Sequence, residues 1–134
     1  MILTTGTARL DGMTIVLNHA IIATTDKQVS AKFFADLMGV GGPEPFGPFA
    51  AVQVNEDLTF DFDDRNEVSP GHYAFLVDDK TFDRALQHVS NAGIDFGSGP
   101  GDGWNHQINH LGGGRGVYIR DPDDHSYELF TAVP

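Results

Sequence analysis

Two histidines and one glutamate are the residues of this chain whose types and positions best suit metal binding. His19 and His72 each begin a segment rich in apolar residues, and Glu128 lies in the short closing segment 126–130. Two imidazoles and one carboxylate on separate strands can hold a divalent metal and leave coordination positions open for water, substrate or dioxygen. Because the chain has no cysteine, any metal site must use His, Asp or Glu.

Each of these residues also has a structural interpretation without a metal. A histidine near a strand end commonly hydrogen-bonds to the backbone, and a glutamate on an edge strand costs little when it faces water. Alternation within the closing segment places Ser126, Glu128 and Phe130 on one face of a strand. A buried carboxylate beside Phe130 would need an ion pair, a hydrogen bond or a bound metal.

Asp61 is the next candidate, as a fourth metal ligand or as a carboxylate base. Residues 58–63 alternate strictly, so the pattern sends Phe60 and Phe62 to one face of a strand and the polar side chains to the other. That polar face either looks into a cavity or is solvated, and the sequence supports both interpretations.

Other polar side chains carry weaker functional hypotheses. Tyr118 can donate a proton to a substrate from the penultimate strand, or can pack within the sheet. His106 and His110 lie with Trp104 in a long loop that could cover a substrate, although we favour solvated surface positions for them. Arg115 is a candidate partner for an anionic substrate.

An internal repeat predicts the elements that position these residues. The segment GHYAFLVDDKTFDRALQHVSNAGI repeats the order of NHAIIATTDKQVSAKFFADLMGV: histidine, apolar strand, Asp-Lys, amphipathic helix and glycine. His72 follows His19 by 53 positions, and the Asp-Lys pair recurs with the same offset. Two such units, each too small for a full core, are expected to pack on one another or on a partner chain.

Local patterns place the individual elements. We expect a strand over 14–23, a helix capped by Asp26 and stopped by Gly39, a Gly/Pro loop over 41–48, and a hairpin of 49–54 and 58–63. The second half should add a strand from His72, a helix, a glycine-rich stretch over 96–114, and strands over 116–120 and 126–131. Asp124 occupies the position of the intervening turn best suited to positive φ.

Composition limits the class of protein. The 134 residues suit one domain, with 1–13 as a tail and 14–134 as the folded part, in modules of about 14–64 and 70–132. A formal charge of −11 disfavours binding to nucleic acid and to anionic membranes. The longest apolar run, 73–77, is far too short to span a bilayer. We therefore expect a soluble cytoplasmic protein with a small-molecule substrate.

These segments resemble the vicinal oxygen chelate superfamily, which includes glyoxalase I, extradiol dioxygenases and bleomycin or fosfomycin resistance proteins. The resemblance covers roughly residues 14–131 and is carried by LNHAII, FFADLMGV, GHYAFLVDD, NAGI and GRGVYIRDPDDHSYELF. It implies an α+β fold of two βαβββ modules forming a U-shaped or barrel-like mixed sheet, with helices outside and a divalent metal on the concave face. His19, His72 and Glu128 match the family's metal-ligand positions.

The resemblance leaves three functions open. A three-ligand site with iron or manganese implies an extradiol-like dioxygenase, which we favour slightly, with His106, His110 or Tyr118 as acid or base. A four-ligand site with nickel or zinc implies a glyoxalase-type lyase or isomerase, in which Asp61 or Glu128 shuttles a proton. A third possibility is a drug-binding protein without catalysis. The resemblance also implies a homodimer, whose sites can draw ligands from both subunits.

Overall fold

The computed structural model describes residues 14–134, which form two compact units. Each unit contains a four-stranded mixed sheet and one α-helix, in the order strand, helix and three further strands. The prediction of an α+β fold made of two βαβββ modules is therefore confirmed. The predicted tail, residues 1–13, lies outside the described residues.

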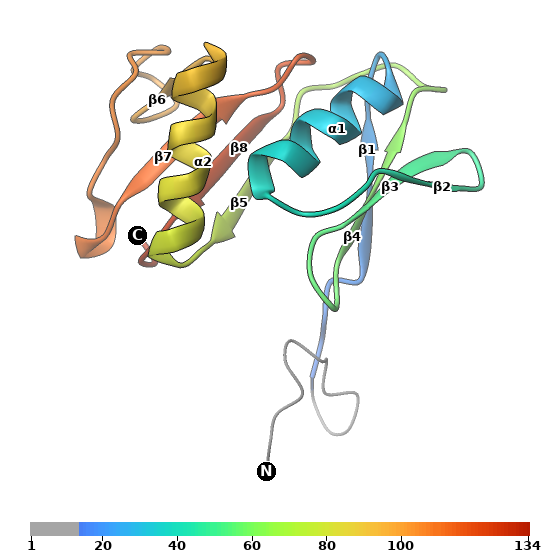
Figure 1. The fold of residues 1–134 in the computed structure, drawn as a ribbon, viewed down its shortest axis with the longest axis horizontal. Helices are drawn as coiled ribbons and strands as arrows, with labels where there is room; N and C mark the ends of the chain where they lie inside the picture. Colours follow the sequence, from blue (N-terminus) through green and yellow to red (C-terminus); the bar gives the residue numbers. More distant parts are fainter. Residues whose placement is uncertain (1–13) are drawn as a thin grey trace. The chain divides into compact units, whose positions relative to one another are not determined.

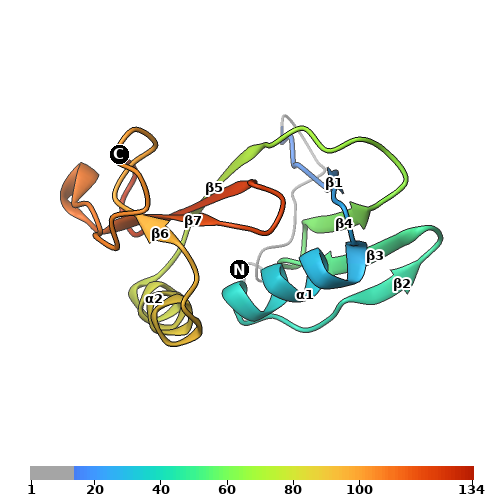
Figure 2. The same cartoon turned by 90° about the horizontal axis from the view of Figure 1, so that it is seen from above.

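Module one holds its sheet against a single helix. Its elements are β1 (His19–Ala23), α1 (Lys27–Met38), β2 (Glu44–Phe46), β3 (Phe49–Gln53) and β4 (Thr59–Asp63). The strand order is β1-β4-β3-β2, with β1 parallel to β4. Figures 1 and 2 show α1 along one face of this sheet. On that face the Phe34 ring stacks on Phe60 at 4.9 Å between ring centres and contacts Phe62 at 5.8 Å.

Module two repeats this arrangement. Its elements are β5 (His72–Leu76), α2 (Asp79–Ala92), β6 (Phe96–Gly97), a short 3-10 turn (Leu111–Gly113), β7 (Gly116–Arg120) and β8 (Ser126–Phe130). The strand order is β5-β8-β7-β6, with β5 parallel to β8. Alternate residues of β7 and β8 are fully buried with the inner face of α2: Val117, Ile119, Tyr127 and Leu129 with Phe82, Ala85 and Val89. β8 is thus a central strand.

Local sequence explains where each helix begins and ends. The Asp26 carboxylate accepts hydrogen bonds from the backbone N–H groups two and three residues further on, at 3.0 and 3.2 Å, as predicted. Asp78 caps α2 in the same way. Gly39 and Gly93 follow the two helices with φ of 71° and 67°, a conformation that glycine adopts without strain. Neither helix within residues 14–134 has the length and apolarity needed to cross a bilayer.

Several element predictions need correction. The Gly/Pro stretch 41–48 contains β2, which pairs with β3. Its proline is tolerated because β2 is an edge strand, and three residues are too few for alternation to be visible. The first strand begins at His19 rather than residue 14, and the glycine-rich stretch 96–114 contains β6 and the 3-10 turn. Asp124 has φ of 67°, as predicted.

Candidate metal and substrate site

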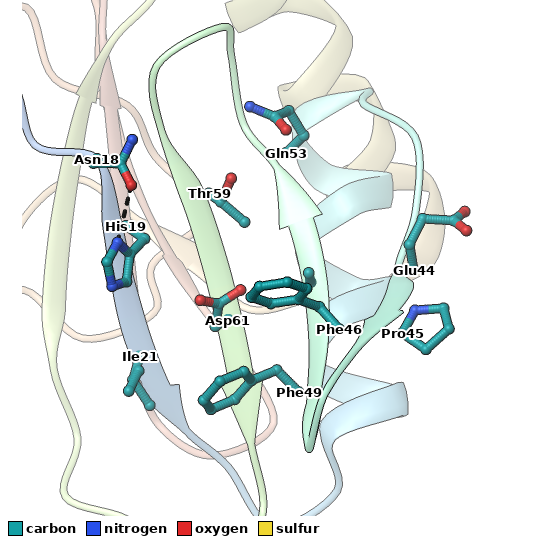
Figure 3. A pocket seen from close by; sticks show the side chains of 11 residues that line it. Asn18, His19, Ile21, Glu44, Pro45, Phe46, Phe49, Gln53, Thr59 and Asp61 are labelled. Carbon is teal, nitrogen blue, oxygen red and sulfur yellow. Dashed lines mark hydrogen bonds between the residues drawn. The ribbon is translucent and has the colours of Figure 1, made fainter.

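The face of the module-one sheet opposite α1 carries the candidate ligands His19 and Asp61. β1 and β4 run in parallel, and Ile21 is opposite Asp61. His19 lies two residues before Ile21 along β1, so its side chain is on the same face of the sheet as Asp61. Figure 3 shows both side chains projecting from this face. The structure therefore gathers an imidazole and a carboxylate from two neighbouring strands of one module.

Asp61 is a buried carboxylate with an incomplete hydrogen-bond shell. The residue is 4% exposed, and its Oδ1 atom is buried without a hydrogen-bond partner. Burial raises the pKa of Asp61 above its ordinary value, and attraction to His19 partly offsets the rise. Of the two interpretations of the alternating segment 58–63, the structure supports the cavity: this carboxylate does not lie on a solvated strand face.

The same face is hollowed into an open pocket of about 580 Å³. Its walls combine aromatic and aliphatic side chains with a few polar groups (Figure 3), contributed by Asn18, His19, Ile21, Glu44, Pro45, Phe46, Phe49, Ala51, Gln53, Thr59 and Asp61. A mostly apolar concavity with few polar groups is typical of small-molecule sites. Sequence reasoning missed Glu44, Pro45 and Phe46 because β2 was not recognised as a strand.

The corresponding face of module two joins His72 to Glu128. Nε2 of His72 lies 3.0 Å from Oε1 of Glu128, and Glu128 is 7% exposed. Because β8 lies between β5 and β7, the edge-strand interpretation of Glu128 is wrong. Its buried carboxylate has the imidazole partner that burial requires.

Tyr118 belongs to this histidine–glutamate group. Its ring stacks on the His72 ring with 5.6 Å between centres and 17° between planes. Burial raises the pKa of the Tyr118 hydroxyl, and the negative charge of Glu128 and a hydrogen bond to it add to the rise. Tyr118 therefore stays protonated at neutral pH and can donate to the Glu128 carboxylate.

The two modules place a carboxylate at the same position relative to their histidine. In module one His19 pairs with Thr59 and Asp61 lies two residues further along β4; in module two His72 pairs with Ser126 and Glu128 lies two residues further along β8. Asp61 is therefore the structural counterpart of Glu128. The constant offset of 53 did not reveal this, because Asp61 and Glu128 are 67 positions apart.

The loop residues have local contacts instead. The His106 ring lies 4.5 Å from that of Phe96, and Nδ1 of His110 lies 3.2 Å from the carbonyl oxygen of Gly114. Arg115 is bound by Asp79 and Asp83, two carboxylates of α2, at 2.9 and 2.6 Å. These ion pairs tie the start of β7 to α2, which explains Arg115 without an anionic substrate.

The two faces present donor atoms of the types that bind a divalent metal. Within residues 14–134 no three His, Cys, Asp or Glu side chains form a group that could hold one, so each module presents a pair. The unpartnered Oδ1 of Asp61 has a lone pair to offer a cation. The distance of 3.0 Å between Nε2 of His72 and Oε1 of Glu128 also suits two ligands of one ion. Two donors bound at right angles about 2.1 Å from an ion lie about 3.0 Å apart.

Comparison with known proteins identifies the family. The model of the Glyoxalase/Bleomycin resistance protein/Dioxygenase superfamily matches residues 16–129. The chain belongs to this superfamily. Its described histidine–carboxylate pairs, from β1 and β4 and from β5 and β8, thus lie within the part of the chain that matches this superfamily.

Individual known proteins differ in their similarity to this chain. Oxidase ChaP-H1 is 44% identical with a TM-score of 0.81, covering 90% of this chain and 97% of its own. Oxidase ChaP-H2 is 38% identical with a TM-score of 0.80, covering 91% and 96%. Glutathione transferase FosA of Serratia marcescens is 26% identical over 120 residues, which are 84% of this chain and 78% of FosA.

Proposed function

We propose that this protein is a divalent-metal-dependent oxidase or dioxygenase that binds a small molecule through two neighbouring oxygen atoms. The observation that carries the proposal is the 44% identity to an oxidase across 97% of that protein's length. A second oxidase is 38% identical over a similar span. The extradiol-like dioxygenase remains the form of this chemistry that we favour.

We propose His19, His72 and Glu128 as the metal ligands, supplied by both modules of one chain or by two chains of a homodimer. Three protein ligands leave positions for both substrate oxygens and for dioxygen. When bound, iron or manganese would stabilise negative charge on the substrate oxygens and permit oxidation by dioxygen. Family resemblance and the donor groups of both modules support this assignment.

The remaining residues of the site would prepare the substrate. Asp61, whose Oδ1 is unpartnered, can accept a proton from a substrate hydroxyl, and its raised pKa makes it a better base than an exposed aspartate. Tyr118 would hold the Glu128 carboxylate in place through its hydroxyl. Phe46 and Phe49 of the module-one pocket would contact the apolar part of the substrate and exclude water.

A glyoxalase-type lyase or isomerase is the alternative enzyme. It is favoured by one specific observation: Asp61 occupies the position in module one that Glu128 occupies in module two, which offers two histidines and two carboxylates. Nickel or zinc would suit that set. A binding protein without chemistry is the non-enzymatic alternative.

Metal content and dioxygen uptake test the proposal together. The protein would be purified anaerobically without an affinity tag or chelator, analysed for metals beside His72→Ala, and assayed with catechol in an oxygen electrode after loading with iron(II) or manganese(II). We expect one metal per chain, lost in the variant, and dioxygen uptake that depends on the metal. Matched controls are wild type without metal and His88→Ala, which removes a histidine of α2 that has no role in the proposed site.

The other outcomes separate the alternatives. A nickel or zinc protein that converts the methylglyoxal–glutathione hemithioacetal without dioxygen would establish the glyoxalase chemistry instead. Absence of metal after reconstitution with iron, manganese, nickel and zinc would refute the enzyme and favour the binding protein. We also propose that the protein is a cytoplasmic homodimer. Sedimentation of the full chain would test the dimeric state.

A further inference from the structure

We propose that Asn18 is a positioning residue that fixes the tautomer of His19. The amide holds the imidazole with its proton on Nδ1, which leaves the Nε2 lone pair free to bind a metal. The proposal deepens the proposed function, since it concerns a ligand of the same site. It rests on contacts within module one.

The side chains of Asn18 and His19 are in direct contact. Nδ1 of His19 lies 3.0 Å from Oδ1 of Asn18, the hydrogen bond drawn in Figure 3. A neutral imidazole has one nitrogen that donates and one that accepts, and an amide oxygen can only accept. If the amide presents its oxygen to the ring, Nδ1 must carry the proton.

A hydrogen bond to a neighbouring backbone carbonyl fixes the orientation of the Asn18 amide. Nδ2 of Asn18 donates to the backbone carbonyl oxygen of Asp57 at 3.4 Å. A flipped amide would place its oxygen against that carbonyl, where two acceptors repel each other, and would lose the donor. The backbone is held as well, because the Thr59 N–H donates to the Asn18 carbonyl at 2.9 Å.

The chemical consequence concerns which nitrogen can bind a metal. Metal-binding histidines are commonly oriented by a hydrogen bond from their second ring nitrogen to an oxygen acceptor, which sets the tautomer and the direction of the lone pair. In water the neutral histidine side chain favours the proton on Nε2. Asn18 therefore reverses the solution preference and prepares Nε2 of His19 before any metal arrives.

No amide side chain precedes the histidine of module two, which supports a specific role for Asn18 in module one. The residue before His72 is Gly71, which has no side chain, and its N–H donates to Nδ1 of His125 at 2.8 Å. There the ring of His72 is held through Nε2 by Glu128 and by stacking on Tyr118. The repeat thus positions its two histidines through different ring nitrogens.

Imidazole ¹⁵N spectra of the metal-free protein test the proposal directly. At a pH where the rings are neutral, wild type should show a protonated Nδ1 and an unprotonated Nε2 for His19. Asn18→Ala should return the ring toward the Nε2-protonated form, whereas Asn18→Asp, which keeps an oxygen acceptor, should retain the wild-type pattern. The His72 signals serve as an internal control and should stay unchanged.

Metal affinity provides the second readout. Zinc titration should give about 10- to 100-fold weaker binding to Asn18→Ala and near wild-type binding to Asn18→Asp. A wild-type His19 protonated on Nε2, or an Asn18→Ala ring that keeps its proton on Nδ1, would overturn the inference. If no metal binds to wild type, the proposed function fails, while the tautomer spectra still decide the role of Asn18.

Discussion

Replacing Asp61 with asparagine should stabilise the metal-free protein while weakening its function. The carboxylate is 4% exposed, and its Oδ1 has no hydrogen-bond partner in the described structure. Asparagine keeps the shape of the side chain and removes the charge. The free energy of unfolding should therefore rise, because a buried charge without a full set of partners is more costly than a neutral amide.

The expected gain in the free energy of unfolding follows from one buried atom, Oδ1 of Asp61. A buried polar atom without a partner costs about 1–3 kcal/mol. The amide leaves a neutral atom at the same place, so we expect a gain near the lower end, about 1 kcal/mol, or about 4 °C in Tm for a chain of this length. Burial raises the pKa of Asp61 above 3.8. The gain should therefore be complete above the folded pKa and should vanish as pH falls through 3.8.

Thermal and chemical unfolding of metal-free protein would measure this gain. Because the chain carries a formal charge of −11, removing any carboxylate reduces repulsion, so a matched control is required. Glu67→Gln removes one charge from an exposed position of the same module. If Asp61→Asn is no more stable than Glu67→Gln, the Asp61 carboxylate is adequately partnered in the folded protein and the reasoning is wrong.

Adding metal to wild type and to Asp61→Asn would test whether Asp61 is a metal ligand. A metal that binds only the folded state raises Tm in proportion to its affinity and concentration. If Asp61 is a fourth ligand, the increase in Tm with zinc or nickel should be smaller in Asp61→Asn than in wild type. An equal increase in both proteins would assign only His19, His72 and Glu128 to the metal.

Two further predictions concern the elements that carry the site. Phe34→Ala should lower the free energy of unfolding by about 3–5 kcal/mol, because it removes a fully buried ring that stacks on Phe60 and contacts Phe62. Urea unfolding would check this, and a loss below about 1 kcal/mol would contradict the packing described. Asp78→Ala should lower Tm at neutral pH, because hydrogen bonds from Thr81 depress the pKa of Asp78 and stabilise its ionised form. That difference should disappear as pH falls below 3.8 and through the depressed pKa, and a difference independent of pH would show that the carboxylate charge does not stabilise the cap.

The two histidines proposed as metal ligands were predictable because the repeat is regular where they occur. His19 and His72 begin equivalent strands, and their offset of 53 is shared by the Asp-Lys pair at the start of each helix. Helix caps and glycine stops were predictable for the same reason, since each depends on a few neighbouring residues. The assignment of His19, His72 and Glu128 to one metal stays a prediction.

The equivalence of Asp61 and Glu128 was not predictable from the repeat offset. The second module has a longer connection before its last strands, so the two carboxylates are 67 positions apart. Only strand pairing shows that each lies two residues beyond the partner of its histidine. The solvated-edge interpretation of Glu128 failed similarly, because position in a sheet depends on which strands pair.

Local sequence was enough to predict the repeat, the order strand, helix and two strands in each unit, and the helix boundaries, and it nominated His19, His72 and Glu128 as candidate ligands. These features follow from contacts between residues close in the chain and from the periodicity of each element. The tertiary structure decided which face is hollowed, that Asp61 is buried without a full set of partners, and that Asn18 meets both His19 and the Asp57 carbonyl. The contact from Asn18 to Asp57 joins residues 39 positions apart and depends on strand register, which local sequence does not specify.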